Sequence, residues 1–327
     1  SNDQAFSLSK NGSNGYEITL NLPKGKYEYK LTRGSWATAE CEQGGSIKEN
    51  RQLMVNGDTT VVLAVSQWAD HFPPPAKKST ANKNVHIIDT AFFIPQLNRY
   101  RRIWVYLPPT YSSTHKKYPV LYMHDGQNLF DDATAYSGEW GVDEALDTLG
   151  TQTKECIVVG IDNGLDKRLN EYSPYDMEKY GKGEGDAYVD FLVKTLKPYI
   201  DKKYRTKRCR KHRFVAGSSM GGLISMYAAA KYPKVFGRAG IFSPAFWVAP
   251  EIYRYSSGKK FKKQKLYFIA GELESNEMVP DMQKLYDQLL LQGVKKNNMQ
   301  LMTAPDGKHS EWFWKREYPR FFNWIMN

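Results

Sequence analysis

Two different patterns of hydrophobic and polar positions divide the chain near residue 75. Before this point, short segments such as residues 16–20 and 27–31 alternate hydrophobic and polar side chains, and an apolar run spans residues 59–65. Alternation with a period of two is typical of half-buried β-strands, and regularly spaced short strands favour a small sandwich. We therefore expect an all-β, immunoglobulin-like sandwich in this first part.

Beyond residue 85 the pattern changes, because strand-like apolar runs alternate with segments of helical spacing. This alternation is typical of an α/β fold with a mostly parallel sheet covered by helices on both faces. The expected strands are residues 101–107, 118–123, 155–161, 213–216, 238–242, 265–270 and 299–303, and the expected helices are residues 139–149, 186–199, 219–231, 278–291 and 310–325.

A proline-rich boundary separates the two patterns. Three consecutive prolines at residues 73–75 begin a stretch of small and charged residues that continues to residue 84. Stiff, exposed connectors have this composition. We therefore expect a β-sandwich domain over residues 1–72, a linker over 73–84 and an α/β domain over 85–327.

The composition and charge exclude several classes of protein. No run approaches the roughly 18 apolar residues that a membrane-spanning helix needs. The net charge is +11, and much of the basic excess lies in residues 202–211 and 259–263. No nucleic-acid-binding motif accompanies these runs. We therefore expect solvated basic loops and no nucleic-acid partner, and a preference for anionic surfaces or polymers stays open.

Three widely separated cysteines, Cys41, Cys156 and Cys209, show no CxxC pair and no metal-ligand spacing. We therefore expect no disulfide scaffold. The first residues carry no signal-peptide pattern, and a leader removed before this numbering begins would leave no trace.

The clearest local motif runs from Gly217 to Gly221 and fits G-x-S-x-G with Ser219 at its centre. It directly follows a predicted strand and directly precedes a predicted helix, which is the context of a nucleophile elbow. There the serine occupies a strained turn, the flanking glycines avoid clashes, and the helix N-terminus favours developing negative charge. We therefore predict an α/β-hydrolase with Ser219 as its nucleophile, against the alternative of an ordinary glycine-rich turn.

A serine hydroxyl needs a base that accepts its proton during attack. The chain order of this fold is serine, acid, histidine, and only one of the six histidines, His309, follows Ser219. It lies between the last predicted strand and the terminal helix, where the base is expected. We therefore predict that His309 is the general base.

The acid should follow the strand at residues 265–270, where Glu272, Glu274 and Glu277 occur. Either type of carboxylate can orient the imidazole. We favour Glu274, because a loop position past the end of the strand can turn back towards His309, and Glu272 and Glu277 remain alternatives.

Two backbone donors should stabilise the tetrahedral intermediate. The N–H of Met220, directly after the nucleophile, is the expected first donor. The second should come from the loop at residues 124–130, and Gln127 is our choice.

A metal site is the rival interpretation of this loop. Without a second histidine nearby we expect no metal and no cofactor. The rival ligands would be His124, Asp125, Asp131 and Asp132.

These motifs resemble those of the esterase D-type putative esterase family over nearly all of the chain beyond the linker. The family includes acetylxylan and feruloyl esterases of carbohydrate esterase family one, siderophore trilactone esterases and mycolyltransferases. The resemblance implies a serine carboxylic-ester hydrolase, and the usual Gly-x-x-Asp acid segment matches Gly271 to Glu274 with glutamate in place of aspartate. The segments that carry the resemblance are residues 123–130, 162–164, 217–223 and 243–247.

The first part resembles a starch- or glycogen-binding-type carbohydrate module through residues 27–31, 34–36 and 49–51 and the closing Trp68. An initial strand is missing from this match. The resemblance implies that exposed tryptophans dock sugars, and Trp36 and Trp68 are the candidates. Packing in the core or between domains is an equal alternative for both.

A sugar-binding-type module joined to an esterase resembles polysaccharide esterases, which implies an exported enzyme that removes acetyl or feruloyl groups from plant polysaccharide or oligosaccharide. Trp140 and Trp247 would suit stacking against a sugar or phenolic ring, although aromatic side chains also fill cores. A siderophore trilactone esterase is the main alternative, because a basic surface suits an anionic iron–catecholate. A non-catalytic glycan-binding protein is the alternative of another class, and the ordered Ser219, acid and His309 argue against it. The oligomeric state stays open.

Overall fold

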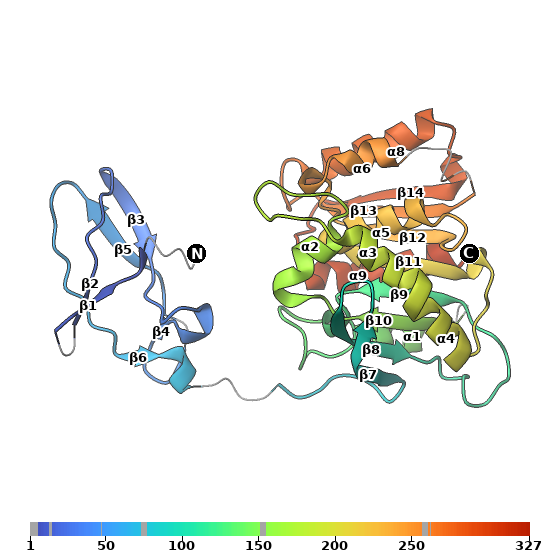
Figure 1. Cartoon of the computed structure of the whole chain (residues 1–327), viewed down its shortest axis with the longest axis horizontal. Helices are drawn as coiled ribbons and strands as arrows, with labels where there is room; N and C mark the ends of the chain where they lie inside the picture. Colours follow the sequence, from blue (N-terminus) through green and yellow to red (C-terminus); the bar gives the residue numbers. More distant parts are fainter. Residues whose placement is uncertain are drawn as a thin grey trace. The chain divides into compact units, whose positions relative to one another are not determined.

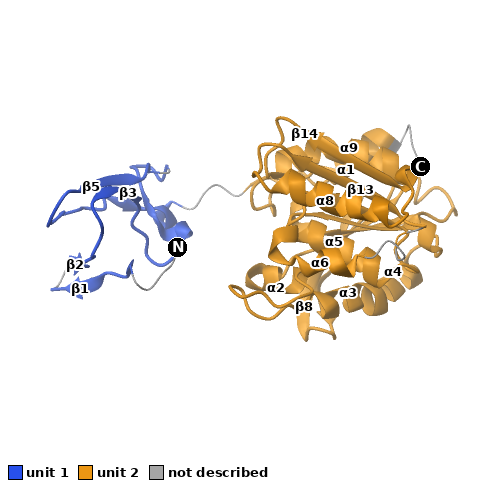
Figure 2. Cartoon of the chain, turned by 90° about the horizontal axis from the view of Figure 1, so that it is seen from above, with its two compact units in different colours: residues 1–76 blue, residues 77–327 orange. Residues whose placement is uncertain are grey.

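The chain divides into two compact units, residues 1–76 and 77–327 (Figure 2). The structure is a computed structural model. Of the predicted linker, residues 73–76 lie outside the part that the structure describes. The described residues are 6–12, 15–46, 48–72, 77–150, 155–256, 261 and 263–327.

The N-terminal unit is all-β in its described part, but its strands form three separate two-stranded antiparallel sheets rather than two larger packed sheets. Residues 59–65, predicted as a strand, form no strand, and all except the half-buried Val65 are exposed. The preceding strand β5 (Arg51–Val55) pairs with β3 (Gly25–Tyr29). Ala39 and Cys41 are the buried hydrophobic residues of the described part, so little apolar core joins the sheets. The pairs are β1 (Ser9–Asn11) with β2 (Gly15–Glu17), β3 (Gly25–Tyr29) with β5 (Arg51–Val55), and β4 (Glu40–Cys41) with β6 (Gln67–Trp68).

The C-terminal unit is built on one eight-stranded sheet with the order β14-β13-β12-β11-β9-β10-β8-β7, which descends from top to bottom in Figure 1. Strands β9 to β14 pair in parallel, whereas β8 pairs antiparallel with β7 and β10. This is the predicted α/β-hydrolase sheet, with β7 as a strand that the sequence pattern does not single out. The strands are β7 (Val85–Ile94), β8 (Arg99–Tyr106), β9 (Val120–His124), β10 (Ile157–Ile161), β11 (Arg213–Ser218), β12 (Arg238–Phe242), β13 (Lys265–Gly271) and β14 (Met299–Ala304).

Helices cover both faces of this sheet, because successive side chains of a strand point to opposite faces. Val120 and Tyr122 of β9 pack in one core with α3, α5 and α8, whereas Leu121 and Met123 pack in another with α1 and α9. The predicted helix at residues 186–199 is α3 and α4 joined by the π-helical turn η6 (Leu192–Leu196). The helices are α1 (Val142–Gly150), α2 (Arg168–Tyr172), α3 (Gly185–Phe191), α4 (Lys197–Lys203), α5 (Met220–Lys231), α6 (Glu251–Tyr255), α8 (Met278–Leu291) and α9 (Glu311–Met326).

Residues 77–84, which we call the strap, are part of the C-terminal unit and not a free connector. The Ser79 hydroxyl donates to Asp131 (2.8 Å), and the backbone N–H of Asn82 donates to Asp143 (2.9 Å). The side chain of Asn82 donates to Asp147 (2.9 Å). Acidic partners far along the chain therefore order a segment whose composition is typical of a linker.

Candidate active site

Ser219 occupies a strained turn between β11 and α5. Its backbone has φ 59° and ψ −122°, a conformation that residues with a side chain rarely adopt. Two backbone hydrogen bonds hold the turn: Ser219 N–H donates to the carbonyl of Phe242 (2.9 Å), and Ala245 N–H donates to the carbonyl of Ser219 (3.1 Å). The strain is consistent with a side chain held at the carboxyl-terminal edge of the sheet for a functional purpose.

Close packing explains two of the glycines around this turn. A Cβ atom at Gly217 would lie 2.9 Å from a ring carbon of His124, and one at Gly222 would lie 2.8 Å from the carbonyl oxygen of Phe242. The nearest atoms to a Cβ at Gly221 are 3.4 Å away. Glycine is therefore required for close packing at 217 and 222, whereas the clash expected at 221 is wrong, because 3.4 Å is an ordinary van der Waals contact.

The loops after β13 and β14 bring a carboxylate and an imidazole together. Glu274 Oε2 lies 2.6 Å from His309 Nδ1, and the Glu274 side chain is 1% exposed. The two loops touch through backbone, because a Cβ at Gly271 would lie 2.2 Å from the carbonyl oxygen of Gly307. Of the three candidate glutamates, the structure thus places Glu274 against His309, and it leaves Glu272 and Glu277 exposed.

The other oxygen of Glu274 has partners that the sequence pattern does not identify. Ser243 Oγ and the backbone N–H of Gly271 each donate to Glu274 Oε1 at 2.6 Å, and Trp314 Nε1 donates to Ser243 Oγ at 2.9 Å. Ser243 has a positive φ of 42° directly after β12. Its place in the 243–247 segment of the family resemblance is the only signal that could have drawn attention to it.

Ser219 and His309 lie at the same edge of the sheet. Ser219 follows β11 and His309 follows β14, and the strands from β11 to β14 are parallel neighbours whose carboxyl ends meet there. Within the described residues no hydrogen bond joins the two side chains, and His309 Nε2 has no protein partner. Because Glu274 holds Nδ1, Nε2 is the nitrogen left to accept a proton, and such contacts are often longer without substrate.

The backbone N–H groups of Met220 and Gln127, the two predicted oxyanion donors, have no acceptor in the described part of the protein. Met220 begins α5, so its N–H has no intrahelical carbonyl. Gln127 lies in η4 (Gly126–Asn128), its side-chain oxygen accepts from Asn163 N–H (3.1 Å), and its carbonyl accepts from Thr134 (2.7 Å). These contacts fix the loop and leave the Gln127 N–H available to a ligand.

A buried ion pair joins the loop after β9 to the loop after β10. Arg168 donates through Nε to Asp125 Oδ1 (2.6 Å) and through Nη2 to Oδ2 (2.9 Å), and Asn163 Nδ2 also donates to Oδ1 (2.8 Å). Although burial opposes ionisation, the Arg168 guanidinium and the Asn163 amide hold the pKa of Asp125 below its usual value. No local pattern in the sequence reveals this pair, which positions the loop carrying Gln127.

The rival metal site is not assembled. His124 is buried, its Nδ1 lies 2.9 Å from the Tyr188 hydroxyl, and burial lowers its pKa to about 4, which keeps the imidazole neutral. Asp125 is paired with Arg168, and Asp131 accepts from the strap. Among the residues that the structure describes, no group of three or more histidine, cysteine or carboxylate side chains is arranged to hold a metal ion.

The two predicted substrate-binding tryptophans lie in different environments. Trp247, in η8 (Phe246–Val248), is 49% exposed and follows Ala245, which bonds to Ser219. Trp140 is 3% exposed, with its ring centroid 5.0 Å from that of Phe242 and 5.6 Å from that of Trp314. Trp140 is thus a core residue that supports Trp314, so its position does not support contact with a substrate.

The fold and the cluster at the carboxyl edge of the sheet define an α/β-hydrolase-type esterase. A family model described as "Putative esterase" matches residues 94–279, which is more than half of the chain. The chain therefore belongs to the putative esterase family and is a carboxylic ester hydrolase.

Several curated proteins are similar in sequence. The uncharacterized protein YbbA of Bacillus subtilis is 26% identical over 242 residues, covering 69% of this chain and 92% of YbbA. An endo-1,4-beta-xylanase/feruloyl esterase of Xylanibacter ruminicola is 29% identical over 179 residues, covering 53% of this chain and 23% of that protein. An alpha-amylase of Niallia circulans is 47% identical over 70 residues, which are 21% of this chain and 5% of the amylase.

Solved structures of esterases share the fold. A ferulic acid esterase matches with a TM-score of 0.59 and 21% identity, covering 75% of this chain and 99% of that one. An enterochelin esterase from Shigella flexneri matches with a TM-score of 0.57 and 18% identity, covering 75% of this chain and 58% of that one. At these identities the similarity concerns the fold. No helix in the described ranges is both long and apolar enough to cross a membrane.

Proposed function

We propose that the protein hydrolyses carboxylic esters through an acyl-enzyme formed on Ser219. His309 Nε2 takes the Ser219 proton as Oγ attacks the ester carbonyl, and returns it to the leaving alcohol oxygen when the carbon–oxygen bond breaks. Water, deprotonated in turn by His309, then releases the acid and regenerates Ser219. The single observation that carries the proposal is the strained Ser219 turn at the sheet edge where Glu274 holds His309 Nδ1 at 2.6 Å.

The other residues have defined roles in this proposal. Buried Glu274 orients the imidazole and stabilises the imidazolium that forms during attack. The N–H groups of Met220 and Gln127 donate to the oxyanion of the tetrahedral intermediate, where preorganised donors contribute most. Trp247, half-exposed beside the Ser219 turn, offers a ring surface to the substrate.

We further propose that the substrate is an acetylated or feruloylated plant polysaccharide or oligosaccharide. Similarity to a xylanase/feruloyl esterase supports this substrate class. The 70-residue similarity to an alpha-amylase has about the length of the N-terminal unit, which supports a carbohydrate-binding role for that unit. A polymeric plant substrate also favours action outside the cytoplasm, after export of the protein.

The mechanism is tested with a nitrophenyl acetate assay on the wild type and Ser219→Ala, and with covalent trapping by a fluorophosphonate. We expect Ser219→Ala to lose at least about 1000-fold in kcat and the trapped mass to lie on Ser219. Ser113→Ala, an exposed serine away from the site, is the matched control and should keep full activity. Equal rates for the wild type and Ser219→Ala, with no adduct, would reject the serine mechanism and favour a non-catalytic glycan-binding protein. An adduct on another residue would reject Ser219 as the nucleophile.

The substrate class is tested separately on the active wild-type protein. Release of ferulate or acetate from xylan is the expected result. Cleavage of a catecholate trilactone instead would support the siderophore alternative, whose fold-level relatives include the enterochelin esterase. Failure on both, with nitrophenyl acetate still cleaved, would reject the substrate and leave the mechanism standing.

A further inference from the structure

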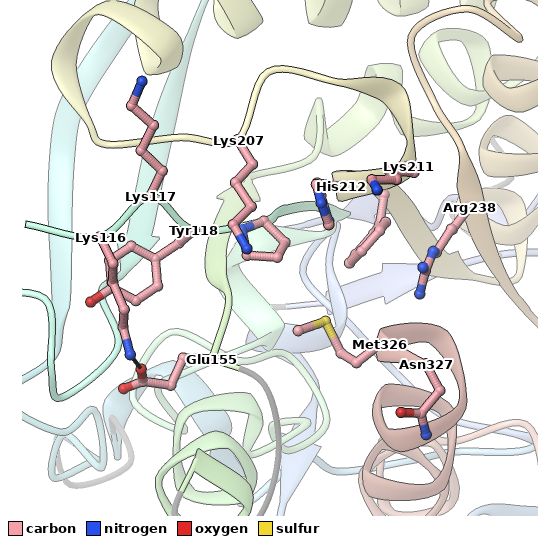
Figure 3. Close-up of a pocket in the computed structure, with 12 residues that line it drawn as sticks. Lys116, Lys117, Tyr118, Glu155, Lys207, Lys211, His212, Arg238, Met326 and Asn327 are labelled. Carbon is pink, nitrogen blue, oxygen red and sulfur yellow. Dashed lines mark hydrogen bonds and ion pairs between the residues drawn. The ribbon is translucent and has the colours of Figure 1, made fainter.

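A pocket lies at the opposite edge of the sheet from Ser219. Its volume is about 450 Å³, and it is lined at the amino ends of β9, β11 and β12 and by the last residues of α9. Figure 3 shows Lys207, His212 and Arg238 around it, with Met326 and Asn327 below them. The ends of β11, from Arg213 to Ser218, are roughly 17 Å apart at 3.3 Å per residue. The pocket is therefore separate from the ester site.

Basic side chains outnumber acidic ones around this pocket, because Lys116, Lys117, Lys207, Lys211 and Arg238 line it together with Glu155. Lys207, Lys211 and Arg238 line it and form no ion pair with any residue that the structure describes. Glu155, the acidic side chain in the lining, is already occupied by Lys116 and by Thr110. These three cations thus line a space in which no described carboxylate is paired with them.

Arg238 is the most constrained of these cations. It is half-buried at the start of β12, donates one hydrogen bond to the carbonyl of Ile325, and lies with Cζ 5.1 Å from the Phe214 ring centroid. Burial lowers its pKa, but a guanidinium stays charged in proteins and has five N–H donors. A desolvated cation without a counter-ion is unfavourable, and a bound oxyanion would relieve this cost.

We propose that this pocket binds a ring-sized polar ligand that carries an oxyanion, namely a uronic acid or a sugar phosphate. Arg238 holds the oxyanion through its unused guanidinium donors, and Lys207 and Lys211 approach it from the loop before β11. The volume is within the range of small-molecule sites and exceeds what a bare inorganic anion fills. The sequence predicts that the basic run at residues 202–211 is a solvated loop. In this proposal, two of its residues, Lys207 and Lys211, bind the ligand.

This site does not depend on the proposed ester chemistry. The test is isothermal titration of the full-length protein with D-glucuronate, with glucose 6-phosphate and with neutral glucose, up to millimolar concentrations. We expect glucuronate or glucose 6-phosphate, but not glucose, to bind, with an affinity that falls as salt is raised. Whichever acid binds more tightly identifies the source of the oxyanion.

Two variants locate the binding. Arg238→Gln should weaken it about 10- to 100-fold, because hydrogen bonds between charged partners are replaced by neutral ones. Lys207→Ala/Lys211→Ala should weaken it without touching the Arg238–Ile325 contact, so that a folding defect of Arg238→Gln leaves the test intact. Lys295→Ala/Lys296→Ala removes the same charge near η9 (Lys296–Asn298), outside this pocket, and should bind like the wild type.

Nitrophenyl acetate hydrolysis, which occurs at the far edge of the sheet, serves as the folding control for all variants. The proposal is overturned if neither acid binds better than glucose. It is also overturned if the Lys207→Ala/Lys211→Ala variant binds as tightly as the Lys295→Ala/Lys296→Ala control.

Discussion

The Ser243 hydroxyl is a single-residue link between an aromatic core and the acid of the site. It accepts from Trp314 Nε1 (2.9 Å) and donates to Glu274 Oε1 (2.6 Å), while Glu274 Oε2 contacts His309. Removing it leaves Glu274 with the backbone N–H of Gly271 as its other donor on Oε1. Ser243 should therefore act as a positioning residue that works through Glu274.

We predict that Ser243→Ala lowers kcat for nitrophenyl acetate about 10- to 100-fold with KM little changed, since a hydrogen bond to a charged group contributes about 1.5–3 kcal/mol. Trp314→Phe, which removes the donor to Ser243 but keeps an aromatic ring in the core, should cost less. Steady-state kinetics and the melting temperature are measured together. An unchanged kcat in a stable Ser243→Ala protein would show that Gly271 alone holds the acid.

Of the residues in the proposed site, those that the sequence alone suggests are the ones whose chemistry is tied to local chain order. Ser219 follows from its motif and flanking elements, and His309 follows from being the only histidine downstream. Ser243 and Arg168 could not be found in this way, because their partners come from loops that only the sheet brings together. The predicted substrate-binding role of Trp140 is not supported for a different reason. An aromatic residue at the start of a predicted helix gives no indication of whether its side chain is buried, and Trp140 is 3% exposed.

The strap illustrates the same limit for a whole element. Its composition predicts a connector, but its hydrogen bonds reach Asp131, Asp143 and Asp147, some 50 to 65 positions further along the chain.

Strands with a largely apolar sequence, such as β12 (Arg238–Phe242), could be predicted to the residue. By contrast, residues 59–65 are apolar but form no strand, because β-structure requires a partner strand as well as a favourable sequence.

Asp143 is the buried carboxylate that accepts a hydrogen bond from the backbone N–H of Asn82 in the strap. We expect it to make the stability of the folded protein depend on pH. Its side chain is fully buried, and burial, with the neighbouring Glu144, raises its pKa to about 7. In the unfolded chain the carboxyl titrates near 3.9. Between about pH 4 and 7 the folded protein therefore holds a proton that the unfolded chain has lost, and this group makes stability fall as pH rises through that window.

We predict that Asp143→Asn melts at a higher temperature than the wild type at pH 8 and at nearly the same temperature at pH 4. The amide can still accept from Asn82 N–H, and the gain in unfolding free energy at pH 8 should be about 1–2 kcal/mol. The control is Asp147→Asn, which alters a carboxylate that accepts from Tyr106 and from both strap asparagines, and it should destabilise the protein. Parallel pH profiles for Asp143→Asn and the wild type would contradict the assignment.

At the scale of the whole molecule, we expect the N-terminal unit to bind carbohydrate and the C-terminal unit to catalyse ester hydrolysis. The C-terminal unit contains Ser219, Glu274 and His309 together with both large buried cores. The N-terminal unit exposes Trp36, at 66%, and has little core of its own in its described part. A chain that begins at Lys77 keeps the strap, whereas one that begins at Val85 loses it, so the pair separates the contribution of the strap from that of the N-terminal unit.

We predict that the chain from Lys77 hydrolyses nitrophenyl acetate within about twofold of the full-length rate and melts close to the full-length protein, because no partner of the strap is removed. Its retention on insoluble polysaccharide in pull-down assays should drop, and its activity on the polymer should drop with it. The chain from Val85 should melt lower, since Asp131, Asp143 and Asp147 lose hydrogen-bond donors of the strap while staying buried or half-buried. Equal polymer retention by the full-length chain and the Lys77 chain would place carbohydrate binding in the C-terminal unit, and the glycan-binding role of the N-terminal unit would have to be abandoned.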